Sequence, residues 1–205
     1  PRTGNMALPP VIPPVICLDV PSPDPLQNTA KADITALISD WLNRVVDEGA
    51  SVTTDVTPFH GLQVPGIAVT DYLKRISLYT RCSKGAIIIA MIYIDRVTRK
   101  HPEIAVTPHT VHRLLTVSVT LAAKYHDDYT LLNSAYAHIG GVTTKELFRL
   151  ERYFLDLIGF RLHVPEEEYK EAAAAYMATS RNIDHTLHTD TPHAADSDYS
   201  PMCIK

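Results

Sequence analysis

The chain contains ten histidines, and the spacing of some of them suggests metal binding. His109 and His112 are three residues apart, so on a helix the two imidazoles would lie on the same face. The run His126-Asp127-Asp128 would add carboxylate oxygens, and imidazole and carboxylate groups are common ligands of zinc and other divalent metals. These residues make a metal-dependent hydrolase one candidate function.

The surrounding sequence does not complete a catalytic site. The HExxH, GxSxG, P-loop and dinucleotide-binding motifs are all absent, and no HD-type set of metal ligands recurs. The three cysteines, Cys17, Cys82 and Cys203, are far apart and form no CxxC pair, which argues against a cysteine-ligated zinc site and against a disulfide framework. The sequence therefore predicts that the protein is not an enzyme, that it needs no metal or cofactor, and that it is intracellular, in the cytoplasm, the nucleus or both.

The charge balance argues against a general nucleic-acid binder. The chain of 205 residues has a formal net charge of -4, whereas proteins that bind nucleic acids usually carry a basic face. Salt-sensitive binding to DNA would nevertheless indicate a transcription-factor-like, helical nucleic-acid-binding module, which stays open as an alternative. The one basic cluster that could serve it lies at the end of a predicted helix and consists of Arg96, Arg99, Lys100 and His101.

No segment of the sequence is expected to enter a membrane. The longest apolar run extends from Ala86 to Ile94, far short of the ~20 residues that a spanning helix needs. The apolar stretch between Ala7 and Val20 is interrupted by prolines, which the helical core of a signal peptide would not tolerate. A membrane partner is therefore not predicted.

The spacing of the apolar residues predicts an all-α protein. Eight of the fifteen prolines lie in the first 28 residues, so residues 1–30 are expected to form an extended or disordered arm. Residues 31–57 should contain one helix, ending near Gly49, and a linker. An Ala-rich helix is expected over residues 166–179, and residues 180–205 are polar, lack periodicity and are expected to be disordered.

Five further helices with short connections are expected in the middle of the chain, where no strand pattern competes with them. Ser83 is placed to cap the second of the five, and Thr107 with Pro108 has the residue types favoured at the start of the third. Thr143 with Glu146 forms a capping-box pattern for the fifth. The second helix is apolar on almost all sides, so the others should surround it. The expected helices cover residues 69–80, 84–100, 108–126, 133–140 and 144–158.

Four short segments mark these helices, namely Asp71-Tyr72-Leu73, Tyr93-Ile94-Asp95-Arg96, Leu121-Ala122-Ala123-Lys124-Tyr125 and Leu150-Glu151-Arg152. In this order and at these spacings they resemble a cyclin box, the helical module that binds and activates a protein kinase. The resemblance covers residues 58–165, and the stretch from Asn133 to Val142 is most similar to the phosphate-signalling cyclins of the P and U types. It implies a five-helix cyclin box with an additional helix at each end.

The resemblance also implies a function, that of a regulatory subunit of a cyclin-dependent-type protein kinase. In cyclins, a lysine near the end of the third box helix and a glutamate in the fifth hydrogen-bond to the kinase backbone. These positions correspond to Lys124 and Glu151. Hydrogen bonds that involve a charged group are stronger than neutral ones, which suits such a contact. Without the resemblance, each residue would be interpreted as an ordinary solvated charge.

Three more residues are candidates for the kinase-binding surface by the same resemblance. In the P- and U-type cyclins, an acidic residue near Asp128 can pair with an arginine of the kinase. Asp127 is its neighbour and competes for this role, and a plain loop aspartate is the alternative interpretation. Phe148 and Tyr153 are candidates for the apolar part of the surface, with core packing as the equal alternative.

Two departures from cell-cycle cyclins concern substrates and domain number. The region that matches their Met-Arg-Ala-Ile-Leu docking stretch is Pro65-Gly66-Ile67-Ala68-Val69, and Tyr72 stands at the place of their tryptophan. A substrate-docking groove of that kind is therefore not expected. No second box is visible after residue 165, so the resemblance is to a single-box cyclin.

Overall fold

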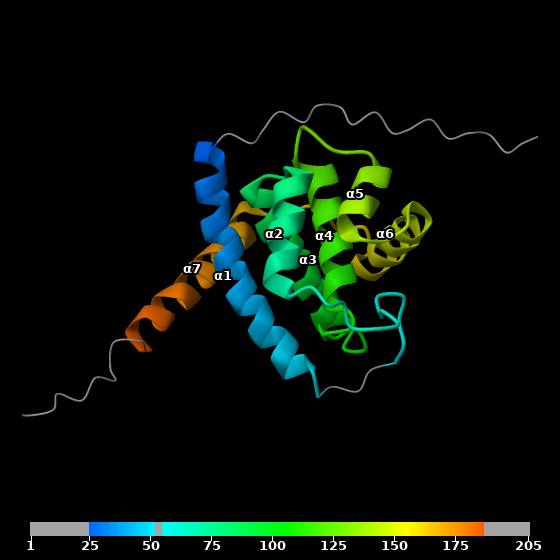
Figure 1. Ribbon diagram of the computed structural model, residues 1–205, viewed down its shortest axis with the longest axis horizontal. Helices are drawn as coiled ribbons and strands as arrows, with labels where there is room; N and C mark the ends of the chain where they lie inside the picture. The colour runs from blue at the N-terminus through cyan, green and yellow to red at the C-terminus, as the bar shows by residue number, and fades with distance from the viewer. Residues whose placement is uncertain (1–24, 52–54, 187–205) are drawn as a thin grey trace, which may run out of the picture.

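Seven α-helices make up the regular structure of residues 25–51 and 55–186, which are the residues that the computed structural model describes (Figure 1). No strand occurs in these residues, so the predicted all-α class is confirmed. Helices α2 to α6 correspond to the five expected box helices, and α1 and α7 are the additional helices at either end. The helices are α1 (Pro25–Gly49), α2 (Val69–Thr80), α3 (Lys84–Lys100), α4 (Val111–His126), α5 (Asn133–Gly140), α6 (Thr144–Ile158) and α7 (Glu166–Thr186).

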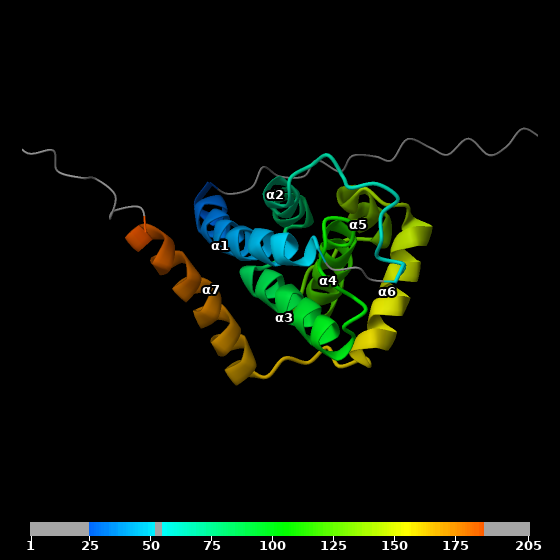
Figure 2. The same ribbon diagram turned by 90° about the horizontal axis from the view of Figure 1, so that it is seen from below.

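Helix α3 lies at the centre of the molecule, as its apolar sequence predicts. Every residue from Ala86 to Ile94 is buried, on all sides of the helix. The helix packs against α4, α6 and α7, while α1 packs against α2 and α7. Figure 2 shows α1 and α7 on one side of the α3–α4 centre and α6 on the other. None of the helices that the structure describes is both long and apolar enough to cross a bilayer.

Most helix ends lie where the capping residues predict them. The Ser83 hydroxyl accepts a hydrogen bond from the Ala86 amide at 3.0 Å, and the Thr143 hydroxyl accepts one from the Glu146 amide at 3.1 Å. These side chains satisfy backbone donors that the first turn of a helix leaves unpaired. At its C-terminus, α6 ends at Gly159, whose φ of 66° lies in the left-handed region that glycine adopts at little cost.

Three helix boundaries differ from the expected ones: the start of α1, the end of α7 and the start of α4. Helix α1 begins at Pro25 rather than at residue 31, and proline is well tolerated in the first turn of a helix. Helix α7 continues to Thr186 rather than to residue 179, because no glycine or proline interrupts it. The remainder of the predicted arm and tail, residues 1–24 and 187–205, lies outside the described residues.

The predicted start of the fourth helix at Thr107-Pro108 is wrong. Residues 108–110 form a turn, and α4 begins at Val111. The Thr107 amide donates to the Thr110 hydroxyl at 2.9 Å, and that hydroxyl donates to the Ala105 carbonyl at 2.7 Å. The local side-chain bonds of Thr110 therefore hold the proline in a turn that precedes the helix.

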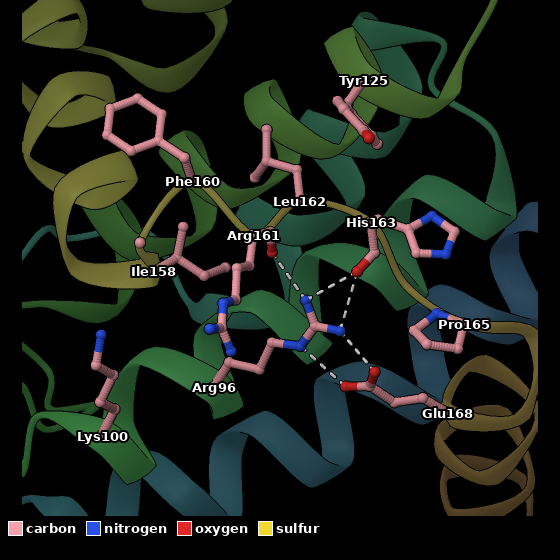
Figure 3. Close-up of a pocket in the computed structure, with 11 residues that line it drawn as sticks. Arg96, Lys100, Tyr125, Ile158, Phe160, Arg161, Leu162, His163, Pro165 and Glu168 are labelled. Carbon is pink, nitrogen blue, oxygen red and sulfur yellow. Dashed lines mark hydrogen bonds and ion pairs between the residues drawn. The ribbon is translucent and has the colours of Figure 1, made fainter.

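The Tyr93-Ile94-Asp95-Arg96 segment fixes the connection between α6 and α7. The Tyr93 hydroxyl donates to the Leu162 carbonyl at 2.6 Å. The Arg96 guanidinium donates to the carbonyls of Arg161 and His163 at 2.9 and 3.2 Å, and it also binds both carboxylate oxygens of Glu168 on α7 (Figure 3). The planar guanidinium suits this forked arrangement. This segment, one of the four that carry the family resemblance, therefore serves as a structural clamp.

Tyr72 is locked into the junction of α2, α4 and α5. Its hydroxyl donates to the Gly140 carbonyl at 2.8 Å and lies 2.5 Å from the Thr116 hydroxyl. The ring of Tyr72 also stacks edge-on against His112, with 4.7 Å between the ring centres. Because Tyr72 is buried and its hydroxyl is hydrogen-bonded, its side chain holds these three helices together.

His112 is buried beside Tyr72 with one ring nitrogen unpaired. Its Nε2 donates to the Ile67 carbonyl at 3.1 Å, which leaves Nδ1 as a buried acceptor without a partner in the described part of the chain. Burial lowers the pKa of His112 below its ordinary value of 6.5, and the hydrogen bond to Ile67 opposes this shift. The folded state therefore holds this imidazole neutral.

The free energy of unfolding should fall as the pH drops below about 6.5, because the unfolded chain then binds a proton at His112 that the folded chain does not. Urea unfolding measured from about pH 7.5 to pH 5.5 would show the decline. In the His112→Gln variant the slope of stability against pH should be smaller than in the parent, because the titrating group is gone. An equal slope in His112→Gln and the parent would contradict this assignment.

Candidate functional site

Lys124 and Glu151 lie together at the junction of α4, α5 and α6. The Lys124 ammonium is 2.5 Å from Oε1 of Glu151, and Asn133 Nδ2 donates to Oε2 at 2.9 Å. The Glu151 side chain is 9% exposed and that of Lys124 is 30% exposed. The two residues that the sequence singles out are thus one ion pair, and Asn133 completes a group of three.

The three side chains come from positions that suit their roles. Glu151 lies in the buried stripe of α6, where a carboxylate is tolerated because both oxygens have partners. Lys124 lies in the last turn of α4, where a cation is favoured by the helix dipole. An ammonium has three donors, so Lys124 keeps protons with which to bind an incoming carbonyl beyond its bond to Glu151.

No site role for Asn133 is predicted from the sequence. Its type and place, at the first residue of α5, are typical of a helix start. In the structure no side-chain cap is formed at this end of α5, and the Asn133 amide is used on Glu151 instead. Only the three-dimensional approach of α5 to α6 brings this partner into view.

The two adjacent aspartates after α4 have different surroundings. The Asp127 carboxylate accepts a hydrogen bond from the Ser83 amide at 2.9 Å and so ties this loop to the start of α3. Asp128 is exposed and has no hydrogen bond or ion pair to any residue that the structure describes. Asp127 therefore has a structural partner, while the carboxylate of Asp128 is available to another molecule.

Phe148 and Tyr153 lie on different sides of α6. Phe148 is 58% exposed and precedes Glu151 by three residues, so the two share a face of the helix. Tyr153 is half-buried, and its ring centre lies 5.4 Å from that of the buried Phe59. The structure thus places Phe148 beside Glu151 on the outer surface. It places Tyr153 over the core, and core packing is the alternative that the sequence left open for both residues.

An open depression of about 820 Å³ lies between the end of α4 and the connection after α6, and part of its wall is charged, with Arg96, Lys100, Arg161 and Glu168. Tyr125, which follows Lys124 in α4, lines it together with Phe160 and Leu162 from the connection after α6 (Figure 3). Tyr125 and Phe160 are 53% and 66% exposed, so two aromatic rings stand open to solvent. Phe160 also has a φ of 57°, a conformation that costs a bulky residue free energy and that tends to be retained at functional sites.

Sequence reasoning missed Tyr125, Phe160 and Leu162 as site residues. The loop before α5 adds two more exposed apolar side chains, Tyr129 at 67% and Leu132 at 78% exposure. We call the whole set the α4–α6 surface: a charged centre, one free carboxylate and exposed apolar side chains. Its members are Lys124, Asn133, Glu151, Asp128, Tyr125, Tyr129, Leu132, Phe148, Phe160 and Leu162.

The histidines that suggested a metal site are not brought together. His109 is exposed and lies against the Gly61 carbonyl, whereas His112 is buried under Ile67. His126 lies within 3.2 Å of the Tyr93 hydroxyl and the Leu162 carbonyl and belongs to the clamp described above. Over residues 25–51 and 55–186, no group of three or more histidine, cysteine, aspartate or glutamate side chains is arranged to hold a metal ion.

The basic cluster at the end of α3 is engaged within the protein. Arg96 binds Glu168, and Arg99 pairs with Asp95 at 2.8 Å. Lys100 and His101 both lie within 3.3 Å of the Leu157 carbonyl near the end of α6, where cations satisfy unpaired helix carbonyls. The cluster thus stabilises helix ends and the connection after α6.

Comparison with known proteins agrees with this architecture. The family model described as Cyclin matches residues 16–162. Cyclin-U4-1 of Arabidopsis thaliana is 39% identical over 137 residues, covering 64% of this chain and 68% of that protein. Cyclin-P4-1 of Oryza sativa subsp. japonica is 33% identical over 176 residues, covering 80% of this chain and 83% of that protein.

Other plant relatives are matched over a smaller share of their length. Cyclin-U1-1 of Arabidopsis thaliana is 42% identical over 106 residues, which cover 52% of this chain and 50% of that protein. The residues that the family model matches contain α2 to α6, and the predicted resemblance to P- and U-type cyclins is confirmed. This chain belongs to the cyclin family, with a single cyclin box.

Proposed function

We propose that this protein is a regulatory subunit that binds and activates a cyclin-dependent-type protein kinase through the α4–α6 surface. The observation that carries the proposal is the Lys124–Glu151–Asn133 group, which holds charged hydrogen-bonding atoms at the edge of exposed aromatic side chains. Specific protein interfaces combine an apolar patch with a limited number of hydrogen-bonded polar groups, and aromatic side chains are enriched among the residues that dominate their binding energy.

The group suits recognition of backbone rather than of a particular side chain. Lys124 is held by Glu151, so its ammonium is already oriented and loses little conformational entropy on binding. Its remaining protons can bind kinase carbonyls, and the glutamate can accept from a kinase amide at the partly exposed edge. Such charge-assisted bonds are roughly twice as strong as neutral ones.

The depression between α4 and the connection after α6 provides the apolar part of the contact. Tyr125, Phe160 and Leu162 form its apolar side, and a helix of the kinase with two or three apolar side chains on one face fits such a groove. Aromatic residues supply large contact areas at low entropic cost and are enriched among the residues that dominate binding energies. Phe148 extends the apolar area on the other side of Glu151.

Asp128 supplies a separate contact on the same surface. Its carboxylate is exposed and unpaired among the described residues, so an arginine of the kinase can approach it without displacing a bond of this protein. Asp127 suits that role less well, because one of its oxygens already accepts a hydrogen bond from the Ser83 amide. The pairing would strengthen at low salt, as expected for an exposed ion pair.

Activation follows from preferential binding. A kinase that exchanges between active and inactive arrangements shifts toward the one that this protein binds more tightly. The kinase's own lysine, glutamate and metal-binding aspartate then carry out phosphoryl transfer. In this account the present chain contributes no catalytic group, and its effect on the rate is set by its difference in affinity for the two arrangements.

Affinity purification of the full chain from its source cell, followed by mass spectrometry, tests the proposal. A protein kinase should co-purify with the parent chain. The Asp128→Lys variant replaces an exposed carboxylate that carries no internal bond, so it should fold normally and recover less kinase. If no protein kinase co-purifies with the parent chain, the proposed function is wrong.

A further inference from the structure

A second cleft lies beside the depression of the α4–α6 surface, and Glu168 lines both of them. It has a volume of about 340 Å³ and lies between α1, α3 and α7. Figure 2 shows α7 and α6 on opposite sides of α3. The apolar wall of the cleft is formed by Trp41 of α1 and Tyr176 of α7, whose rings meet edge to face with 5.3 Å between their centres.

The cleft is acidic. Asp95, Glu168 and Glu171 line it, and Arg99 is the cation among its described lining residues. Asp95 and Glu168 already pair with arginines, but Glu171 is exposed and has no hydrogen bond or ion pair within the described part of the chain. Burial first, and the negative charge of Asp95 second, raise the pKa of the Tyr176 phenol, which is consistent with a negative potential at this wall.

We propose that this cleft binds a basic peptide segment of another protein, with an aliphatic side chain against Trp41 and Tyr176 and an adjacent arginine or lysine on Glu171. Charge complementarity favours a cationic occupant, because the free group is a carboxylate. An acidic segment would be repelled by Glu171, and a purely apolar segment would leave the Glu171 carboxylate unpaired.

The binding itself does not rest on the kinase proposal. Its use does: if the α4–α6 surface holds a kinase, a basic segment bound in the neighbouring cleft places its protein beside that kinase, as a substrate or regulator of the same assembly.

Trp41 is the single tryptophan of the chain, so its fluorescence reports directly on the cleft. The purified protein is titrated with a short peptide in which two arginines flank a leucine, and with a matched peptide that carries glutamates in their place. The basic peptide should change the Trp41 emission in a saturable way, with weaker binding at high salt. The acidic peptide should have no effect.

Glu171→Lys should weaken binding of the basic peptide by about tenfold or more, because repulsion replaces attraction at the cleft. Asp47→Lys makes the same charge change at an exposed position of α1 that does not line the cleft, and it should bind as the parent does. Glu171→Gln serves as the second variant if the lysine disturbs folding. The absence of a saturable Trp41 signal, equal binding of the two peptides, or undiminished binding to the Glu171 variants would each overturn the proposal.

Discussion

Alanine at both Lys124 and Glu151 should abolish kinase binding while leaving the helical fold in place. Losing one partner of a buried, charged hydrogen bond across an interface costs about 2–5 kcal/mol, so removing both charges should lower the affinity by roughly a thousandfold or more. The double change is preferable to Glu151→Ala alone, which would leave Lys124 and Asn133 facing an empty site. Pull-down of the kinase measures the loss of binding, and circular dichroism measures whether the helical fold is retained.

A second ion pair of the molecule provides the matched control. Arg113 and Glu146 lie 2.5 Å apart, each with a side chain that is 25% exposed, and join α4 to α6 away from Lys124. Alanine at both of these positions should lower the stability of the protein but leave kinase binding at the parent level. Full-strength kinase binding by the double variant would contradict the assignment of Lys124 and Glu151 to the kinase-binding surface.

Replacing Phe160 with asparagine should weaken kinase binding and leave the protein as stable as the parent, or more stable. Phe160 is 66% exposed, so its removal forfeits little burial, and its φ of 57° is one that asparagine adopts more readily. Relief of the backbone strain is worth up to about 1 kcal/mol. Loss of an aromatic anchor at an interface typically costs more than about 1 kcal/mol, or several-fold in affinity.

The opposite signs of these two effects make the Phe160 variant informative. Urea unfolding reports the stability, and titration of the kinase with the purified variant reports the affinity. Tyr79→Asn is the control, since Tyr79 is 61% exposed but lies on α2, outside the α4–α6 surface. A Phe160→Asn variant that binds the kinase as tightly as the parent would remove the aromatic depression from the proposed interface.

The helices could be predicted closely where local residues determine them. Ser83, Thr143 and Gly159 cap helix ends by bonds or backbone angles that involve only neighbouring residues, so the sequence predicts those ends correctly. The start of α4 was missed because Thr110 bonds to both Thr107 and Ala105 and thereby stabilises a turn at Pro108. Two arrangements of similar local propensity competed there, and side-chain bonds of the loop decided between them.

The site could be predicted only in part. Lys124 and Glu151 were identified by resemblance, but that they contact one another depends on how closely α4 approaches α6. The same holds for Asn133, whose amide reaches Glu151 from α5. The roles of Asp127 and Asp128 could not be separated in the sequence, because only the position of Ser83 in space shows which carboxylate is occupied.

The aromatic residues show the same limit. Phe148 and Tyr153 are both large side chains on one amphipathic helix, and nothing in their types distinguishes surface from core. Contact with Phe59, from the loop before α2, places Tyr153 over the core and leaves Phe148 outside. Phe160 could not be predicted as a site residue, because it follows the helix-ending Gly159. The shape of that segment is set by Tyr93 and Arg96, which are distant in the sequence.

The most direct test of the central claim is the phosphoryl-transfer activity of the co-purifying kinase, measured with and without this protein. Addition of the parent chain should raise the activity by about tenfold or more, saturating as the complex fills, which corresponds to a population shift of about 1.4 kcal/mol or more. The double alanine variant at Lys124 and Glu151 should fail to raise it at the same concentrations. A kinase whose activity does not respond to the parent chain, or responds equally to the variant, would contradict the account.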